Sequence, residues 1–326
     1  MKTKVQKRLQ YIAALIVAGV LALAVLPVSG CEKPASEAAP LLKDPTIAPP
    51  TISSPGVLRV GVDSSRSPFA GRSGNTLIGL DIDIAAALAD ELGLKLETVD
   101  VAGLNSYELS DLFMQGRIDI VMSFQPESES LSPFVMVGPY LVDGPAIFTI
   151  GLTLPSKNFN PDTLIGLKIA ARSSSLSAWQ LESRYGSETV VTYTTLEEAF
   201  DAVGSGSISY VAADAVAGAY LAGKYPNMLC LGYLEQPSKV YIAVAPGNQS
   251  LTDAATSALR TLRDNGILRL VISKWLGLTA ADLVLGTNAI TGIDIPIGDG
   301  PEQDPGDDLP DPSNSDSGEL IEGETP

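Results

Sequence analysis

The sequence contains no histidine among its 326 residues. Histidine is the side chain that most often exchanges protons near neutral pH, and it is also the commonest metal ligand. Its absence removes the usual general base and the usual serine triad, so the sequence is a poor match for an ordinary hydrolase or metal enzyme. We therefore expect a protein that is not an enzyme and that uses neither a metal nor a cofactor.

Basic residues are missing from the C-terminal part of the chain. From Val284 to Pro326 the sequence has eleven acidic residues, no basic residue and few apolar ones. Such a segment cannot bury enough surface to order itself, so we predict that residues 283–326 form an acidic disordered tail. Cation buffering and partner binding are alternative roles for this tail. Of the formal net charge of −17, the body between the predicted signal and the tail, 31–283, carries −10. This moderately acidic surface argues against nucleic acid as a partner, because phosphates require a basic surface.

The first 30 residues have the layout of an export signal. An apolar run over about 11–26 ends in Val28-Ser29-Gly30, directly before Cys31, and four basic residues precede it: Lys2, Lys4, Lys7 and Arg8. The segment resembles the bacterial lipobox, which implies cleavage before Cys31 and acylation of that residue by more than one chain, because one chain binds membranes only marginally. An uncleaved anchor is the alternative, although the run is short for a spanning helix of about 20 residues. We predict a signal peptide over 1–30 and an extracytoplasmic protein anchored to the cell membrane by lipid at Cys31.

Cysteine occurs only twice, at Cys31 and Cys230. If Cys31 carries lipid, Cys230 has no partner, so no intramolecular disulfide supports the fold. Cys230 lies in the apolar segment 227–231, and we expect it in a buried strand. Residues 31–54 are rich in proline, alanine and serine and show no periodic apolar pattern. They are predicted to form a flexible tether.

Apolar strands alternate with helical patterns through the middle of the chain. Strand–helix alternation at these lengths predicts parallel sheets with right-handed crossovers, and the number of strands requires two sheets. Strands are predicted over 57–62, 94–99, 118–122, 168–171, 189–193 and 209–212, and helices over 80–92, 107–115, 175–185, 196–203 and 215–224.

Seven short motifs occur in an order that resembles the family 3 extracellular solute-binding proteins, which serve amino-acid ABC importers. The motifs are Gly56–Val62, Ser67-Pro-Phe69, Gly79–Asp83, Gly116–Ile120, Gly138-Pro-Tyr140, Leu167-Lys-Ile169 and a pair at 264–268 and 274–277. The resemblance covers about 55–278. It implies an α/β, two-lobed type II periplasmic-binding-protein fold, with two parallel-core sheets joined by two hinge strands. Residues 55–143 plus 241–282 would form lobe 1, and 144–240 would form lobe 2.

Asp214 is the first candidate for ligand binding in such a fold, where ligands lie beyond the carboxyl ends of parallel strands and hinge closure buries them. It ends the apolar segment 210–214 and matches the family's aspartate that pairs with the α-ammonium group of the ligand. A carboxylate there would make a charge-assisted bond. The alternative is an N-cap for the following helix, since aspartate is a preferred cap, and the two roles are compatible.

Arg172, Ser174 and Ser175 follow the predicted strand 168–171. The family usually carries Gly-Thr-Thr here at the start of a helix, and hydroxyl and free N–H groups at a helix N terminus favour an anion. Plain capping is the alternative for the serines. Arg172 could clamp an anionic ligand or face solvent.

The resemblance also implies ligand-binding residues in lobe 1. Phe69 matches a pocket position of the family motif, Ser123 follows the predicted strand 118–122, and Phe124 could stack on a ligand. Core packing is the simpler explanation for either phenylalanine.

The expected carboxylate-binding arginine of the family is absent a few residues beyond Ser123. Ser128 stands there instead, between Glu127 and Glu129. Arg66 occupies a position where many members have a stacking aromatic, and either Arg66 or Arg172 could replace the lost guanidinium. An amino acid, a cationic or peptidic compound and a different small molecule all remain open as ligands.

We therefore predict a monomeric, lipid-anchored receptor that captures a small polar ligand, an amino acid or a related compound. It would deliver this ligand to an ABC transporter permease in the membrane. A ligand-sensing cell-surface receptor without transport is one alternative, suggested by the altered site and the acidic tail. A dehydratase-type enzyme on the same fold is the other.

Overall fold

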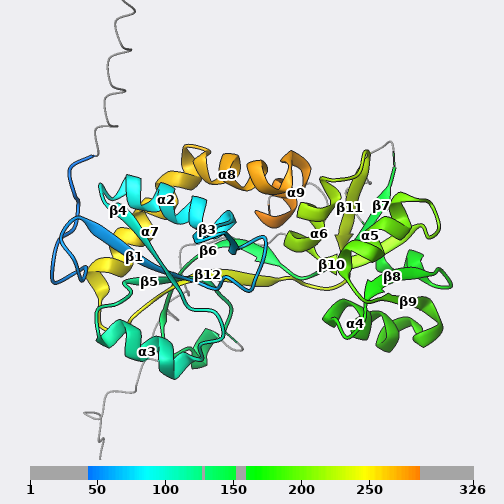
Figure 1. The fold of residues 1–326 in the computed structure, drawn as a ribbon, viewed down its shortest axis with the longest axis horizontal. Coiled ribbons are helices and arrows are strands. Elements are labelled where there is room, and N and C mark those ends of the chain that lie inside the picture. Colours follow the sequence, from blue (N-terminus) through cyan, green and yellow to red (C-terminus); the bar gives the residue numbers. More distant parts are fainter. Residues whose placement is uncertain (1–42, 127–128, 152–158, 287–326) are drawn as a thin grey trace, which may run out of the picture. The chain divides into compact units, whose positions relative to one another are not determined.

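Figure 1 shows the computed structural model of the protein, which describes residues 43–126, 129–151 and 159–286. The predicted signal peptide, Cys31 and nearly all of the predicted acidic tail lie outside these ranges. Over the ranges described, no helix is both long enough and apolar enough to cross a membrane.

The first sheet has the strand order β4-β1-β5-β12-β6. Strand β1 runs parallel to β4 and β5, whereas β12 runs antiparallel to its neighbours β5 and β6. The hairpin of β2 and β3 follows β1 in the chain. The strands are β1 (Val57–Val62), β2 (Gly71–Ser73), β3 (Thr76–Ile78), β4 (Lys95–Asp100), β5 (Ile120–Phe124), β6 (Val135–Asp143) and β12 (Ser238–Val244).

Helices cover both faces of this sheet. Successive side chains of a strand point to opposite faces, and in the central strand β5 buried apolar side chains lie on both faces. Ile120 of β5 belongs to the main core with residues of α2 and α7, whereas Val121 packs with Leu109 and Leu112 of α3. The helices that accompany the first sheet are α2 (Leu80–Glu91), α3 (Ser106–Met114), α7 (Gln249–Asp264) and α8 (Ile267–Leu276). Helix α9 (Leu278–Val284) follows α8 and contacts β6 of this sheet and also the segment that forms the second sheet.

The second sheet has the order β11-β7-β10-β8-β9. Strand β8 runs parallel to β9 and β10, and β7 runs antiparallel to β10 and β11. Cys230 is a free, buried residue of β11, as predicted. The elements are β7 (Pro145–Ile150), β8 (Ile169–Arg172), α4 (Leu176–Tyr185), β9 (Val190–Tyr193), α5 (Leu196–Gly204), β10 (Tyr210–Asp214), α6 (Ala215–Ala222) and β11 (Met228–Tyr233).

The chain passes between the sheets twice. Gly144 alone separates β6 from β7, and residues 234–237 connect β11 to β12. The predicted architecture of two sheets with parallel cores and two joining strands is confirmed. The antiparallel strands at the joins were not predicted. They arise because each join links different sheets, so no crossover helix forces a parallel direction.

The folded body extends beyond both predicted boundaries. Ile52 lies in the segment predicted as tether, yet it is 1% exposed and belongs to the main core. At the other end, Val284 completes α9 and is fully buried. Ile52 and the first residues of the predicted tail therefore pack into the folded body, although most of residues 43–54 are exposed. The sequence did not reveal this because each segment is too short to show a period.

Candidate functional site

Arg66 is fixed on the first sheet, in the loop after β1. Its Nη1 donates to the carbonyl oxygen of Ser123 at 3.0 Å, and its Nη2 donates to Oε1 of Gln125 at 2.8 Å. The guanidinium carbon also lies 5.1 Å from the ring centroid of Phe69, within the range of a cation–π contact. Three predicted site residues, Arg66, Phe69 and Ser123, are thus brought together at the carboxyl ends of β1 and β5.

A buried carboxylate, Asp81, lies beneath this group. Its Oδ2 accepts a hydrogen bond from the Ser123 hydroxyl at 2.5 Å, and its Oδ1 accepts one from the Tyr140 hydroxyl at 2.6 Å. The Tyr140 hydroxyl in turn accepts the Ser123 N–H at 3.1 Å. Burial raises the pKa of Asp81 to about 6, against the two hydrogen bonds and the positive charge of Arg66. The Ser123 hydroxyl is therefore already engaged by the protein.

Asp214 stands at the N-cap position of α6, but its carboxylate makes no capping hydrogen bond. The Val216 N–H donates instead to Oδ1 of Asp143, at 3.0 Å. The same oxygen accepts the Gly144 N–H, also at 3.0 Å. The capping alternative for Asp214 is thus not realised, and Asp143 supplies the cap.

The charges of both lobes meet around Asp214. Its side chain is exposed; partial burial by the surrounding protein raises its pKa, while the positive charges of Arg172 and Arg66 lower it. Burial raises the pKa of Asp143 to about 7, with the Val216 hydrogen bond opposing this and the negative charge of Asp214 adding to it. Two carboxylates and two guanidinium groups therefore interact within one site.

The serines that follow β8 have different roles. The Ser175 side chain caps α4 by accepting the Ala178 N–H at 3.1 Å, so the capping alternative holds for this residue. Ser174 is exposed and has a left-handed backbone with φ 58°. Arg172 is exposed at the end of β8. Ligand contact by these three residues stays a prediction.

Phe124 packs in an aromatic cluster. Its ring meets Phe134 edge-on, with centroids 5.4 Å apart. Phe69 is 4% exposed and belongs to the main core. Both rings therefore contribute to packing, as the simpler alternative held. Ligand contact by Phe69 and stacking on a ligand by Phe124 stay predictions. Ser128, where the family's arginine was expected, lies outside the described residues.

Three polar residues of the site were not singled out from the sequence: Asp81, Tyr140 and Asp143. Asp81 and Tyr140 occur in motifs that were used only to recognise the family order, Gly79–Asp83 and Gly138-Pro-Tyr140. The sequence did carry a signal for Asp81. An aspartate inside an apolar helical pattern faces the core, and a buried carboxylate needs hydrogen-bond partners. For Asp143 the sequence carries no local signal, because its partner Val216 is 73 positions away.

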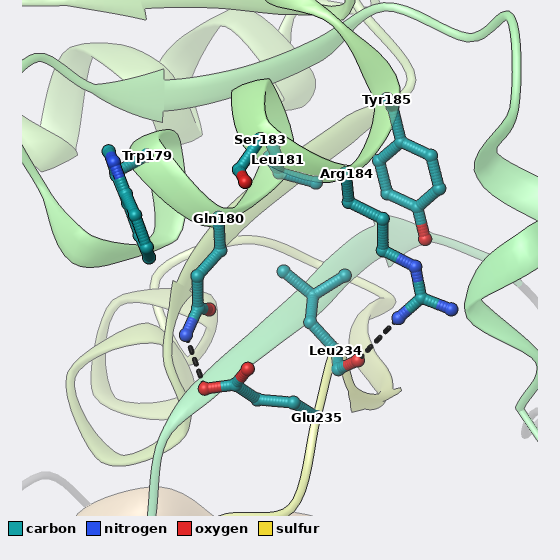
Figure 2. Close-up of a pocket in the computed structure, with 8 residues that line it drawn as sticks. All are labelled: Trp179, Gln180, Leu181, Ser183, Arg184, Tyr185, Leu234 and Glu235. Carbon is teal, nitrogen blue, oxygen red and sulfur yellow. Dashed lines mark hydrogen bonds between the residues drawn. The ribbon is translucent and has the colours of Figure 1, made fainter.

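A separate hollow of about 190 Å³ lies between α4 and the second join, and none of the predicted site residues lines it (Figure 2). Arg184 spans it, donating from Nη1 to the carbonyl oxygen of Leu234 at 3.2 Å, and Gln180 donates to Glu235. In the ranges that the structure describes, no cluster of acidic or cysteine side chains is suited to hold a metal ion.

Two mixed sheets joined twice, with charged residues of both meeting at the strand ends, define a two-lobed periplasmic binding protein of type II. The chain belongs to the bacterial extracellular solute-binding proteins, family 3, whose sequence profile matches residues 58–278. The resemblance stated from the sequence is therefore confirmed. The family consists of solute-binding proteins rather than enzymes.

Individual relatives agree with this assignment. The chain is 25% identical over 232 residues to a "Probable amino-acid ABC transporter-binding protein" of Haemophilus influenzae, covering 68% of this chain and 84% of the relative. A polar amino acid ABC uptake transporter substrate binding protein from Streptococcus thermophilus has the same fold, with a TM-score of 0.59 and 19% identity. The match covers 69% of this chain and 88% of that protein. The unliganded L-cystine solute receptor of Neisseria gonorrhoeae also has this fold, with a TM-score of 0.57 and 18% identity. The match covers 69% of this chain and 94% of the receptor.

Proposed function

We propose that the protein is a lipid-anchored, extracytoplasmic receptor that binds a small polar ligand, an amino acid or a related compound, between its lobes. It acts as a monomer and delivers the ligand to the permease of an ABC importer. The name of the Haemophilus influenzae relative supports both the ligand class and the partner. The lipobox-like sequence before Cys31 supports the anchor.

The observation that carries this proposal is the uncapped carboxylate of Asp214. It makes no bond to its own helix, and it lies within the electrostatic range of Arg172 and Arg66. One carboxylate beside two guanidinium groups is complementary to a zwitterion. The ammonium group of an amino acid pairs with Asp214, and its carboxylate pairs with a guanidinium.

The two lobes contribute different parts of this site. Lobe 1 holds the rigid part, because Arg66 is fixed by its bonds to Ser123 and Gln125. Lobe 2 supplies the amine-binding carboxylate and the start of α4, where Ser174 and Ser175 lie beside Arg172. The proposed ligand-binding residues are Arg66, Phe69, Ser123, Phe124, Arg172, Ser174, Ser175 and Asp214.

A thermal-shift screen of free amino acids tests the ligand class, followed by calorimetry on each compound that raises the melting temperature. A ligand at 100 times its Kd stabilises the folded protein by about 2.7 kcal/mol. Each active amino acid is compared with its N-acetyl derivative and its α-carboxamide. We expect both derivatives to bind more weakly, because each removes one of the two charges that the site recognises.

The matched variants are Asp214→Asn and Asp111→Asn. A hydrogen bond to a charged group contributes about 1.5–3 kcal/mol, so Asp214→Asn should weaken binding by roughly 10- to 150-fold. Asp111 is an exposed residue of α3, so the same chemical change there should leave the affinity unaltered. Equal affinity of the wild type and Asp214→Asn, or equal binding of free and N-acetylated amino acids, would contradict the proposal.

A further inference from the structure

The N terminus of α6 is capped from outside its own segment. Aspartate at an N-cap usually accepts an N–H of the second or third helical residue. Asp214 stands at that position and makes no such bond, whereas Asp143 accepts the N–H of the second helical residue, Val216. A residue of the first sheet therefore takes the place of the helix's own cap.

Asp143 is held firmly in this arrangement. It is 8% exposed, ends β6, and uses the same oxygen to accept the N–H groups of Gly144 and Val216. The next residue takes part as well, because the Gly144 carbonyl oxygen accepts the Ala215 N–H at 2.8 Å. Both of the first two N–H groups of α6 are thus bound by the short join between the sheets.

We propose that Asp143 is a positioning residue that keeps the Asp214 carboxylate available for the cationic group of a ligand by capping α6 in its place. The proposal rests on the proposed function of Asp214. If Asp143 lost its acceptor oxygen, the Val216 N–H would be free two residues after Asp214, which is the usual distance for an N-cap bond. Asp214 would then turn toward its own helix and away from the ligand.

Charge couples the two carboxylates. The charged or titratable groups that face Asp143 are Asp214 at the end of β10, Arg66 after β1 and Tyr233 in β11. A cation that binds at Asp214 stabilises the ionised form of Asp143, which otherwise carries a proton for part of the time near neutral pH. Ligand binding should therefore release a proton.

The first test needs no ligand. The carboxyl carbon of Asp214 is followed by NMR during a pH titration of the wild type, Asp143→Asn and Asp143→Ala, and that of Asp143 is followed in the wild type. Both variants remove the charge of Asp143, but only the asparagine keeps an acceptor oxygen for Val216. We expect Asp214 to titrate at a lower pH in Asp143→Ala than in Asp143→Asn, because a newly accepted N–H stabilises its ionised form. The same Asp214 titration in both variants would overturn the proposal.

The second test measures binding by calorimetry, with L-glutamine and L-arginine as probes. We expect Asp143→Ala to bind at least tenfold more weakly than Asp143→Asn, so that the asparagine rescues binding. At pH 7, in two buffers of different ionisation enthalpy, the wild type should release a proton that Asp143→Asn does not. Equal affinity of the two variants would contradict the positioning role, and equal proton release by the wild type and Asp143→Asn would contradict the charge coupling between Asp143 and Asp214. If neither probe binds the wild type, the proposed function fails for these amino acids, while the NMR titration still decides the role of Asp143.

Discussion

Replacing Asp81 with asparagine should change the pH dependence of stability in a defined direction. Asp81 is 1% exposed and accepts hydrogen bonds from the hydroxyls of Ser123 and Tyr140. Asparagine has nearly the same shape, and its carbonyl oxygen can accept one of these bonds. It also resembles the protonated form of the carboxylate, so the variant removes the titration while it keeps the packing.

The magnitude follows from the pKa of Asp81, which burial raises from its ordinary value of 3.8 to about 6. The folded protein therefore binds this proton more tightly than the unfolded chain does. The contribution of Asp81 to the free energy of unfolding falls as the pH rises from about 4 to above 6. The full loss is at most about 3 kcal/mol. Asp81→Asn should not show this loss, so its stability relative to wild type should increase over the same pH range.

Urea unfolding of the wild type and Asp81→Asn between pH 4 and pH 8 measures this difference. The midpoints should diverge as the pH rises, while the slope m stays the same for both proteins. Asp111→Asn, at an exposed position, is the control for the charge change and should follow the wild type. A constant difference in free energy between wild type and Asp81→Asn across this pH range would refute the reasoning.

Two further predictions concern the core and the anchor. Gly218→Ala in α6 would place its Cβ 2.3 Å from the Phe148 ring, so we expect a loss of about 1–3 kcal/mol in thermal or urea unfolding. Gly223→Ala is its control: there the nearest atom to an added Cβ is 3.4 Å away, and a small change is expected, so equal effects would disprove the packing argument. Cys31→Ser should move the protein from the membrane fraction to the soluble fraction, and membrane association that persists would favour an uncleaved anchor.

Local patterns were sufficient to predict most elements of the fold. The apolar spacing from Leu80 and the stop at Gly93 placed α2 to within a residue of its end, because helix periodicity and a glycine after the last turn are both local signals. The apolar segment around Cys230 likewise identified a buried strand. In each case the information lies within about a dozen neighbouring residues.

The polar contacts of the site depend on residues that are distant in the sequence, and so they could not be predicted in the same way. Aspartate before a helix normally indicates a cap, and this local rule applied to Asp214. The rule fails there because Asp143 arrives from the first sheet and takes the Val216 N–H. The bonds of Asp81 to Ser123 and Tyr140 likewise join residues 42 and 59 positions apart.

The strand order has a consequence for the sequence of events during synthesis. The second sheet is built from one continuous segment, β7 to β11, so all of its strands are available once the ribosome has passed residue 233. The first sheet is different, because β6 pairs only with β12, which starts at Ser238. Until β12 emerges, β6 has no partner and one side of β5 is unpaired. The second sheet can therefore be completed before the first sheet, although the first sheet begins earlier in the chain. Until β12 is available, the edges of β5 and β6 that will pair with it stay open.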